Sequence, residues 1–199
     1  MRYALIALTA VLTALPLQAQ NAAQNVAQDA VQDAARPAVS EPPYAAMQKL
    51  APLAGRWRTV TENTNDGGKT WQASQAAEVI VVIKHKGLLM AEVPISPTAS
   101  GFNMETYITY DQYRGVYRKA AIDDVWGIMD LYEGVLDGDQ LVFTNLKSGT
   151  FFPVGEGRWR AFRLTVEIKT PKRQIAIEAS DDGGKNWFPA FRVLYERAD

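Results

Sequence analysis

Few side chains in this sequence are of the types that act as nucleophiles or bind metal ions. The residue types that are absent therefore exclude several kinds of site. Its 199 residues include no cysteine and a single histidine, His85. Without cysteine the chain has no thiolate nucleophile, no Cys-ligated zinc and no iron–sulfur cluster. His85 stands between Lys84 and Lys86, as expected of a solvated hairpin tip, and no nucleophile motif surrounds it. One histidine also excludes a multi-histidine metal site.

The carboxylates that stand close together lie where turns are expected. The pairs Asp123-Asp124 and Asp137-x-Asp139 could bind a divalent cation. An aspartate at a turn ordinarily accepts local backbone hydrogen bonds, however, and a calcium ion takes six or more oxygen ligands. We therefore favour the local structural role, and we expect no catalytic residue, no metal site and no bound cofactor.

A basic group late in the chain has one member that differs from the rest. Arg158 and the Lys172-Arg173 pair are typical of a solvated rim. Arg160 shares strand parity with Phe162, so we expect it to point toward the interior of the domain near one end. A guanidinium there needs an anionic partner, either an internal carboxylate or the acid group of a ligand. Both alternatives stay open, and internal pairing is the commoner one.

Two segments repeat one motif, S/T-x-D-x-G-x-x-W, which matches the Asp-box of sialidases and related propellers. They run from Thr64 to Trp71, with Asp66, and from Ser180 to Trp187, with Asp182. In such a hairpin the aspartate accepts backbone N–H groups, glycine permits positive φ and the tryptophan packs beneath. A glycan hydrolase would need a multi-bladed propeller, for which this chain is too short. We therefore expect a structural role.

Strand-like runs separated by turn residues occupy most of the chain. Apart from a short helix over Tyr44–Leu53 that ends at Gly55, the sequence shows no helical segment between runs. The expected strands are Arg56–Glu62, Trp71–Lys84, Leu88–Ile95, Phe102–Tyr110, Tyr113–Ala121, Val125–Leu136, Gln140–Asn145, Trp159–Lys169, Arg173–Ala179 and Trp187–Tyr195. The pattern predicts an all-β fold, an antiparallel up-and-down meander of about ten strands. We favour closure into a barrel over a sandwich.

Alternation along the strands indicates which side chains face the interior. The eighth run, for example, has Phe162, Leu164 and Val166 on one side and Arg163, Thr165 and Glu167 on the other. The second, third and sixth runs alternate less cleanly, so their inward face stays open. The inward residues that we expect to bind a ligand are Met104, Ile108, Phe143, Phe162, Phe191 and Tyr195, with Arg160 near one end.

The opening Leu50-Ala-Pro-Leu53-Ala-Gly55-Arg-Trp57 and the later Tyr110-Asp-Gln-Tyr113-Arg-Gly-Val-Tyr117 hairpin carry a family resemblance. They resemble an uncharacterised bacterial family of lipocalin-like proteins, whose G-x-W motif precedes the first strand. The resemblance covers residues 44–199 and implies a small barrel, often with an internal ligand cavity; it transfers no catalytic residue. Nitric-oxide-binding haem barrels open similarly but use a late proximal histidine, which this chain lacks.

Closure of such a barrel predicts one specific contact. The end of the last strand lies beside the start of the first, and Arg197 shares parity with Tyr195. Arg197 should therefore cover the ring of Trp57. Pro189 could mark a bulge that changes the parity, in which case Arg192 would take this role.

The first nineteen residues have the composition of an export signal. Arg2 gives a positive start, Ala4–Leu15 is apolar apart from two threonines, and Ala19 ends a small-residue cleavage site. The apolar run is shorter than the roughly twenty residues that span a bilayer, and no cysteine is present for lipid attachment. We therefore expect cleavage after Ala19, no membrane anchor, and a soluble protein that is periplasmic or secreted.

Residues 20–42 are Ala/Gln-rich and precede the expected barrel domain, residues 43–199. They have almost no apolar stripe, so we expect a flexible linker; a partner-binding helix is the alternative. After removal of residues 1–19, 20 basic residues face 22 acidic ones, a net charge of −2. That balance gives no electrostatic case for binding nucleic acid or anionic membranes. The sequence does not indicate an oligomeric state.

Together these patterns predict an exported barrel that binds a small apolar or amphipathic molecule in its interior. Two other classes stay open. One is an enzyme on the same barrel that uses a cavity carboxylate or tyrosine for acid–base chemistry. The other is a structural or adaptor domain with a filled interior. An open cavity lined by apolar side chains with one cation would favour binding.

Overall fold

The computed structural model describes residues 40–95, 102–169 and 173–198. All the described residues belong to one compact unit, residues 39–199. The expected signal peptide, residues 1–19, and all but the last three residues of the expected linker, 20–42, lie outside the described residues.

The described residues form one short helix, two single 3-10 turns and twelve strands. The helix is α2 (Pro43–Gln48), and the 3-10 turns are Ala51–Leu53 and His85–Gly87. The strands are β1 (Gly55–Asn63), β2 (Gln72–Ala73), β3 (Ala77–Lys84), β4 (Leu89–Pro94), β5 (Met104–Asp111), β6 (Val116–Asp123), β7 (Met129–Asp137), β8 (Gln140–Thr144), β9 (Phe152–Gly155), β10 (Arg158–Glu167), β11 (Arg173–Ser180) and β12 (Phe188–Arg197).

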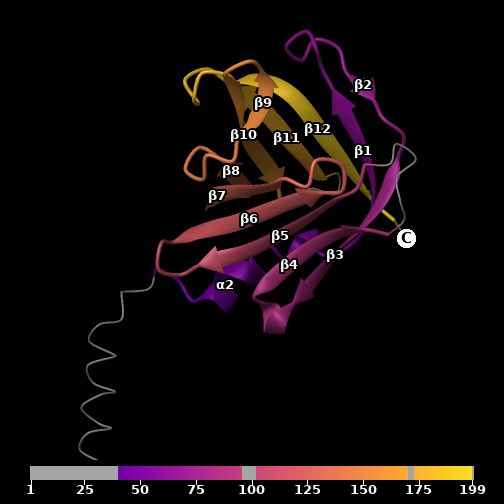
Figure 1. The fold of residues 1–199 in the computed structure, drawn as a ribbon. Helices are drawn as coiled ribbons and strands as arrows, with labels where there is room; N and C mark the ends of the chain where they lie inside the picture. Colours follow the sequence, from indigo (N-terminus) through magenta and orange to yellow (C-terminus); the bar gives the residue numbers. More distant parts are fainter. Residues whose placement is uncertain (1–39, 96–101, 170–172, 199) are drawn as a thin grey trace, which may run out of the picture. The chain divides into compact units, whose positions relative to one another are not determined.

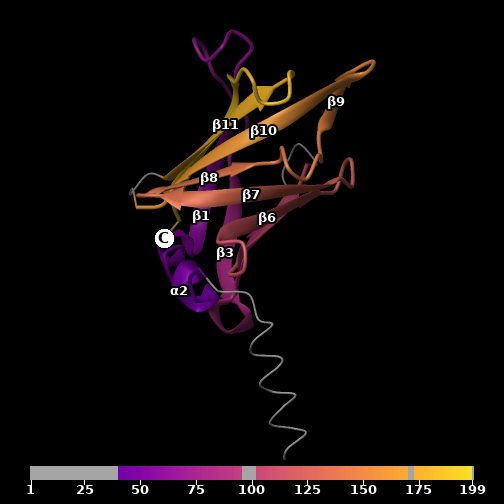
Figure 2. The ribbon, with the colours of Figure 1, turned by 90° about the vertical axis from the view of Figure 1, so that its left-hand side faces the viewer.

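Ten of these strands close into a ring. Figures 1 and 2 show the curved sheet from two sides. The order of the ten strands is β11-β12-β1-β3-β4-β5-β6-β7-β8-β10, and β10 pairs with β11 to complete the circle. All of these pairings are antiparallel, and most join neighbours in sequence. The expected all-β fold, an antiparallel meander closed into a barrel, is therefore confirmed. Closure leaves no unpaired edge among the ten described strands of the ring.

The helix and strand assignments differ from the sequence-based expectation in three places. The run Trp71–Lys84 is broken: β2 pairs with β1 as a two-residue strand, and β3 begins only at Ala77. β9 was not expected; it pairs with the start of β10. The expected helix is interrupted after Gln48 and ends in the 3-10 turn, because Pro52 lacks the N–H that a longer α-helix would use.

Strand direction defines two ends of the barrel, which we call the base and the mouth. The base is where β1 begins and β12 ends, next to α2; the mouth carries the hairpins that follow β1 and β11. At the base, α2 and the following turn bury Ala46, Met47, Leu50 and Leu53. The Tyr117 hydroxyl donates to the Ala46 carbonyl at 2.9 Å, which ties α2 to β6. Apolar side chains therefore plug this end.

The closure contact lies at the base and agrees with the sequence-based expectation. Trp57 of β1 pairs with Arg197 of β12, and the Arg197 guanidinium carbon lies 4.2 Å from the centroid of the Trp57 ring. Arg197 also donates to the Ala54 carbonyl at 2.9 Å. Gly55 has φ +130°, a conformation that favours glycine, and a Cβ there would lie 2.1 Å from Arg197 Nη1, so a larger residue would also displace the Arg197 guanidinium.

A bulge interrupts β12 near its start, as the proline suggested. Phe191 pairs with Ile177 and Pro189 with Glu178, so Ala190 is the extra residue. The bulge precedes Phe191, and the parity from Phe191 to Arg197 is therefore unchanged. Arg192 faces outward instead and lies over the ring of Trp71.

Candidate functional site

The two hairpins that carry the repeated motif, Thr64–Trp71 and Ser180–Trp187, lie at the mouth and have nearly the same internal geometry. Asp66 accepts the backbone N–H groups of Lys69 and Thr70, both at 2.9 Å. Asp182 accepts those of Lys185 and Asn186, both at 3.0 Å. Side-chain and backbone hydrogen bonds lower the pKa of each aspartate to about 2.

The tryptophans of these hairpins are covered by arginines on the outer wall. Arg192 lies 4.3 Å from the ring centroid of Trp71, and Arg163 lies 4.7 Å from that of Trp187. Each arginine also pairs with a glutamate, Arg192 with Glu62 and Arg163 with Glu178. The hairpins thus use their polar groups internally, which fits a structural role.

Inward-facing side chains near the mouth are open to solvent. Met104 shares parity with the buried Thr106 on β5, and Phe191 shares parity with the buried Tyr195 on β12. Yet Met104 is 42% exposed and Phe191 39%, and Thr61 on β1 is exposed as well. Solvent therefore reaches the inner wall in this half of the barrel.

Aromatic side chains gather around the same end. Trp126, in the β6–β7 connection, contacts the ring of Phe102 at 5.7 Å between centroids and that of Phe152 at 5.4 Å. Trp126 is largely exposed, and Phe188 at the start of β12 is partly exposed. We call Trp126, Phe152, Phe188 and Phe191 the aromatic rim.

Arg160 already has its counter-charge in the chain. Its Nε and Nη2 donate to the two carboxylate oxygens of Asp181 at 2.6 and 2.8 Å, and it lies 5.3 Å from the ring centroid of Phe188. The ion pair raises the pKa of Arg160 and lowers that of Asp181. The anionic partner of Arg160 was expected to be either an internal carboxylate or the acid group of a ligand. The structure contains the internal carboxylate, so we do not propose that Arg160 binds the acid group of a ligand.

A different group of charges lies deep in the barrel, toward the base. Glu92 of β4 accepts hydrogen bonds from Arg173 Nη2 and from the Tyr195 hydroxyl, both at 2.9 Å. Arg173 is 5% exposed and its guanidinium carbon lies 3.9 Å from the Tyr195 ring centroid. Lys119 of β6, 7% exposed, points into the same space. We call Glu92, Lys119, Arg173 and Tyr195 the interior cluster.

The interior cluster has more donors than acceptors. Nε and Nη1 of Arg173 are buried without a hydrogen-bond partner. No described residue forms a hydrogen bond or ion pair with the Lys119 ammonium. Burial lowers the pKa of Lys119 to about 8, although nearby Glu92 and Asp130 oppose the shift. Burial and the adjacent Glu92 raise the pKa of Tyr195 well above its usual value, so that its hydroxyl stays a donor.

These groups border a small cavity of about 20 Å³. Glu92, Lys119 and Arg173 line it together with apolar and threonine side chains such as Thr106, Ile108 and Ile175. A volume of this size holds about one water-sized group. Chemically, the arrangement can bind an oxygen acceptor. It does not resemble a nucleophile–base pair, because both oxygens of Glu92 already accept hydrogen bonds.

The residues expected to bind a ligand lie at two levels rather than in one site. Ile108, Phe143 and Tyr195 are buried in the core toward the base, with Phe143 fully enclosed. Phe162 packs half-buried against that core. Met104, Phe191 and Arg160 lie at the mouth.

Sequence reasoning missed Glu92, Lys119 and Arg173. A signal for one of them existed, because Arg173 shares parity with Ile175 and Ile177, the same pattern that singled out Arg160. The expectation that Arg173 belongs to a solvated rim is wrong, since its strand begins at the buried base. Glu92 lies in the third run, whose inward face the alternation leaves open, and Lys119 lies in the fifth run, where a lysine does not by itself indicate an inward position.

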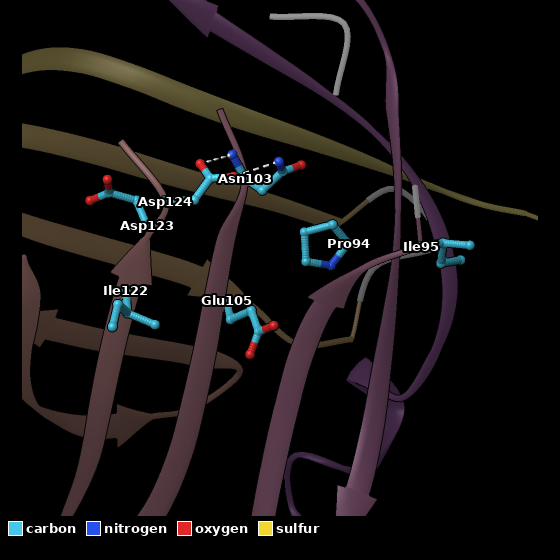
Figure 3. A pocket seen from close by; sticks show the side chains of 7 residues that line it. All are labelled: Pro94, Ile95, Asn103, Glu105, Ile122, Asp123 and Asp124. Carbon is cyan, nitrogen blue, oxygen red and sulfur yellow. Dashed lines mark hydrogen bonds between the residues drawn. The ribbon is translucent and has the colours of Figure 1, made fainter. Parts of the chain in front are cut away.

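The outer wall carries two shallow depressions. One, of about 380 Å³ beside the ends of β4, β5 and β6, includes Glu105, Asp123 and Asp124 (Figure 3). Figure 3 shows Asp124 turned to Asn103, whose N–H groups it accepts, while the other two carboxylates point elsewhere. Asp123 accepts backbone N–H groups of its own turn. Within residues 40–95, 102–169 and 173–198, no three acidic or histidine side chains gather as metal ligands.

The second outer depression, of about 430 Å³, lies over β5, β6 and β7. Its outward-facing charged side chains form ion pairs with one another, because Arg118 pairs with Glu133 and Asp111, and Lys147 pairs with Glu133.

No helix of the described part of the chain is long and apolar enough to cross a membrane.

Comparison with known proteins places the chain in a family. No curated protein matches it. Among solved structures it is similar to the crystal structure of Rv2717c from M. tuberculosis, with 14% identity and a TM-score of 0.41 over 79% of this chain and 100% of that one. Residues 42–197 match the family model described as protein of unknown function DUF1579. Because that match spans most of the chain, the protein belongs to the DUF1579 family.

Proposed function

We propose that this protein is an exported binding protein that holds a small apolar or amphipathic molecule in the mouth half of its barrel. The observation that carries the proposal is the exposure of inward-facing apolar side chains there. Met104 and Phe191 lie on the inner wall, and both are about two-fifths exposed. Apolar surface of this kind gains free energy when a ligand covers it, at about 25 cal/mol per Å².

The surroundings support a concave, mostly apolar site. The aromatic rim supplies large flat side chains, and Phe162 extends the apolar lining downward to the core. An antiparallel barrel of this strand number is wide enough for one small ligand when bulky side chains do not meet across it. The plugged base below gives such a site a floor.

The other two classes have less support. A filled adaptor would cover its inner wall throughout, as the base does, whereas the mouth does not. An enzyme of the expected kind would use a cavity carboxylate or tyrosine for acid–base chemistry, whereas Glu92 and Tyr195 are hydrogen-bonded to each other and Glu92 also accepts from Arg173.

Binding can be tested with the neutral fluorescent probe N-phenyl-1-naphthylamine. We expect saturable fluorescence enhancement at micromolar concentration, displaced by lipid-extract fractions. Phe191→Gln should weaken it at least fivefold. Val135→Gln is the matched control, because Val135 is exposed on the outer wall. Equal effects of the two substitutions, or no saturable binding, would refute the proposal, and turnover of a displacing compound would favour the enzyme.

Export can be tested separately. Expressed with its own N-terminus in a Gram-negative host, the protein should be recovered from the periplasm or medium, and its mass should correspond to a chain beginning at Gln20. A cytoplasmic product with an intact N-terminus would contradict this part of the proposal.

A further inference from the structure

We infer that Arg173 and Lys119, at the floor of the barrel, form a binding site for the carboxylate of the ligand, so that the molecule held is an amphipathic carboxylic acid. This inference rests on the proposed function, since it names the chemical class of the molecule that enters at the mouth. It moves the anion site from Arg160, where the sequence suggested it, toward the base, because Arg173 is the first residue of β11 and Arg160 lies beside the last.

The first step is the unused hydrogen-bonding capacity of Arg173. A guanidinium has five N–H groups, and burial without partners is costly. Only Nη2 finds a carboxylate, at Glu92, while Nε and Nη1 have none. Stacking on the Tyr195 ring holds the guanidinium plane, so the free N–H groups have a fixed direction. A site with fixed, unsatisfied donors suits a planar anion.

The second step is that the nearby acids are already engaged by other donors. The two oxygens of Glu92 accept from Arg173 and from Tyr195. The other neighbouring acid, Asp130, accepts from Tyr132, Asn145 and Thr150. The charges facing Lys119 are therefore Arg173, Glu92 and Asp130, and neither carboxylate forms an ion pair with it within 4 Å. An acceptor from outside the chain would satisfy both cations.

The third step is access from the mouth. On β5 and β6 the side chains mouthward of Lys119 are small, Thr106 and Ala121, which pair with each other; on β11 and β12 the corresponding side chains are the larger Ile175 and Val193. Farther along the same face of β5 comes the exposed Met104. The existing cavity admits one oxygen-sized group, and a carboxylate would enter it with its chain running past these small residues toward the rim.

A buried water is the competing occupant, because the cavity has the volume for one. Water is neutral and has only two lone pairs, so it would satisfy two donors without neutralising the second cation. The two occupants differ in one measurable property. A water site gives no preference for acids over neutral molecules of the same shape.

The experiment compares dodecanoate with dodecanol, which share a chain and differ in the head group. Each displaces N-phenyl-1-naphthylamine from wild type and from Lys119→Met, Arg160→Met and Arg58→Met. We expect dodecanoate to bind wild type at least tenfold more tightly than dodecanol. Lys119→Met should remove most of that preference and leave dodecanol affinity within threefold. Arg58, exposed on the outer face of β1, is the control, and Arg160→Met separates the mouth cation from the floor cations.

Arg173→Met alone would leave Glu92 buried without its cation, so the double variant Glu92→Gln/Arg173→Met is used. Probe binding shows that it is folded, and the acid preference should then be lost. A pH series adds an independent readout. Because Lys119 has a pKa of about 8, the acid preference of wild type should fall between pH 7 and 9, whereas that of Lys119→Met should not.

The outcomes separate the two proposals. If the probe binds and dodecanoate and dodecanol displace it equally in wild type, the cavity holds water and the inference is wrong, while the proposed function stands. If Arg160→Met removes the acid preference and Lys119→Met does not, the inference is also wrong. If wild type binds neither probe nor either competitor, the proposed function fails and the inference falls with it.

Discussion

The base and the mouth of this barrel are built from the same strands, yet the inward-facing arginines at the two ends differ in burial and in hydrogen bonding. At the mouth, Arg160 donates from Nε and Nη2 to the two oxygens of Asp181, and each side chain is about 30% exposed. At the base, Arg173 is almost fully buried, shares its carboxylate with Tyr195 and keeps two nitrogens unpaired. The ion pair at the mouth is partly solvated, and its two carboxylate oxygens both accept from the arginine. The ion pair at the base is buried, and two nitrogens of its arginine have no hydrogen-bond partner.

The difference shows that strand parity and depth are separate variables. Parity puts both arginines on the inner wall, but depth along the barrel sets what removal of each should cost. A surface ion pair contributes about 0–1 kcal/mol, whereas breaking a buried one costs about 3–5 kcal/mol. Four variants test this contrast between base and mouth.

The largest effect is expected at Glu92. Glu92→Gln should lower the free energy of unfolding by about 3 kcal/mol or more, because Arg173 would stay buried without a counter-charge. Urea denaturation of the variant measures the loss. The matched control is Glu178→Gln, which removes the partner of half-buried Arg163 and should cost about 1 kcal/mol or less. Equal losses would erase the distinction between the two levels.

Packing at the base should be nearly as sensitive. Gly134 of β7 lies against Phe143: an added Cβ would stand 2.4 Å from Phe143 Cδ1 and 2.7 Å from the Val142 carbonyl oxygen. Gly134→Ala should therefore cost about 1–3 kcal/mol through overpacking. For comparison, Gly127 near the mouth has open space around it, so Gly127→Ala meets only backbone strain. A tolerated Gly134→Ala, measured by the same denaturation, would mean that the base is looser than described.

The mouth hairpins should contribute a pH-dependent part of the stability. Asp66 and Asp182 have a folded pKa of about 2 against an ordinary value of 3.8. A lowered folded pKa means stability that is present above pH 4 and lost as the pH falls toward 2. We expect the Asp66→Asn/Asp182→Asn double variant to show a smaller drop in thermal midpoint between pH 4.5 and 2 than wild type. Parallel curves for the two proteins would show that the hairpins do not contribute.

The smallest effect is expected at Arg160 itself. Arg160→Met should change the free energy of unfolding by about 1 kcal/mol or less, because both partners of the ion pair are partly solvated. The change should also weaken with added salt. A loss as large as that of Glu92→Gln would place Arg160 in a dry environment and reverse the comparison.

The fold could be predicted from the sequence because its signals are local. Alternation on β10 and β11, together with turns such as Asp137-Gly138, indicated the strands and their order. β9 was missed because Phe152–Gly155 has no alternation of its own and depends on pairing with β10. β2 was merged with β3 because only pairing with β1 separates them.

The candidate site could be predicted only in part, for a physical reason. Parity told which side of a strand Arg160 occupies, but not how deep it lies. Depth is set by where α2 plugs the barrel, a contact between residues far apart in sequence such as Ala46 and Tyr117. The interior cluster joins β4, β6, β11 and β12, and no spacing along the chain indicates that these strands bring their charges together.

Pairing of β1 with β12 also has a consequence for how the barrel is made. The ring closes only when the segment ending at Arg197 reaches Trp57, so the last-synthesised strand completes the first. Such a long-range contact is slow to form, and until it does, the edges of β1 and β11 stay unpaired. If the chain crosses the membrane unfolded, as the export that we propose would allow, late closure would help it. No closed barrel can form before β12 is free to pair with β1.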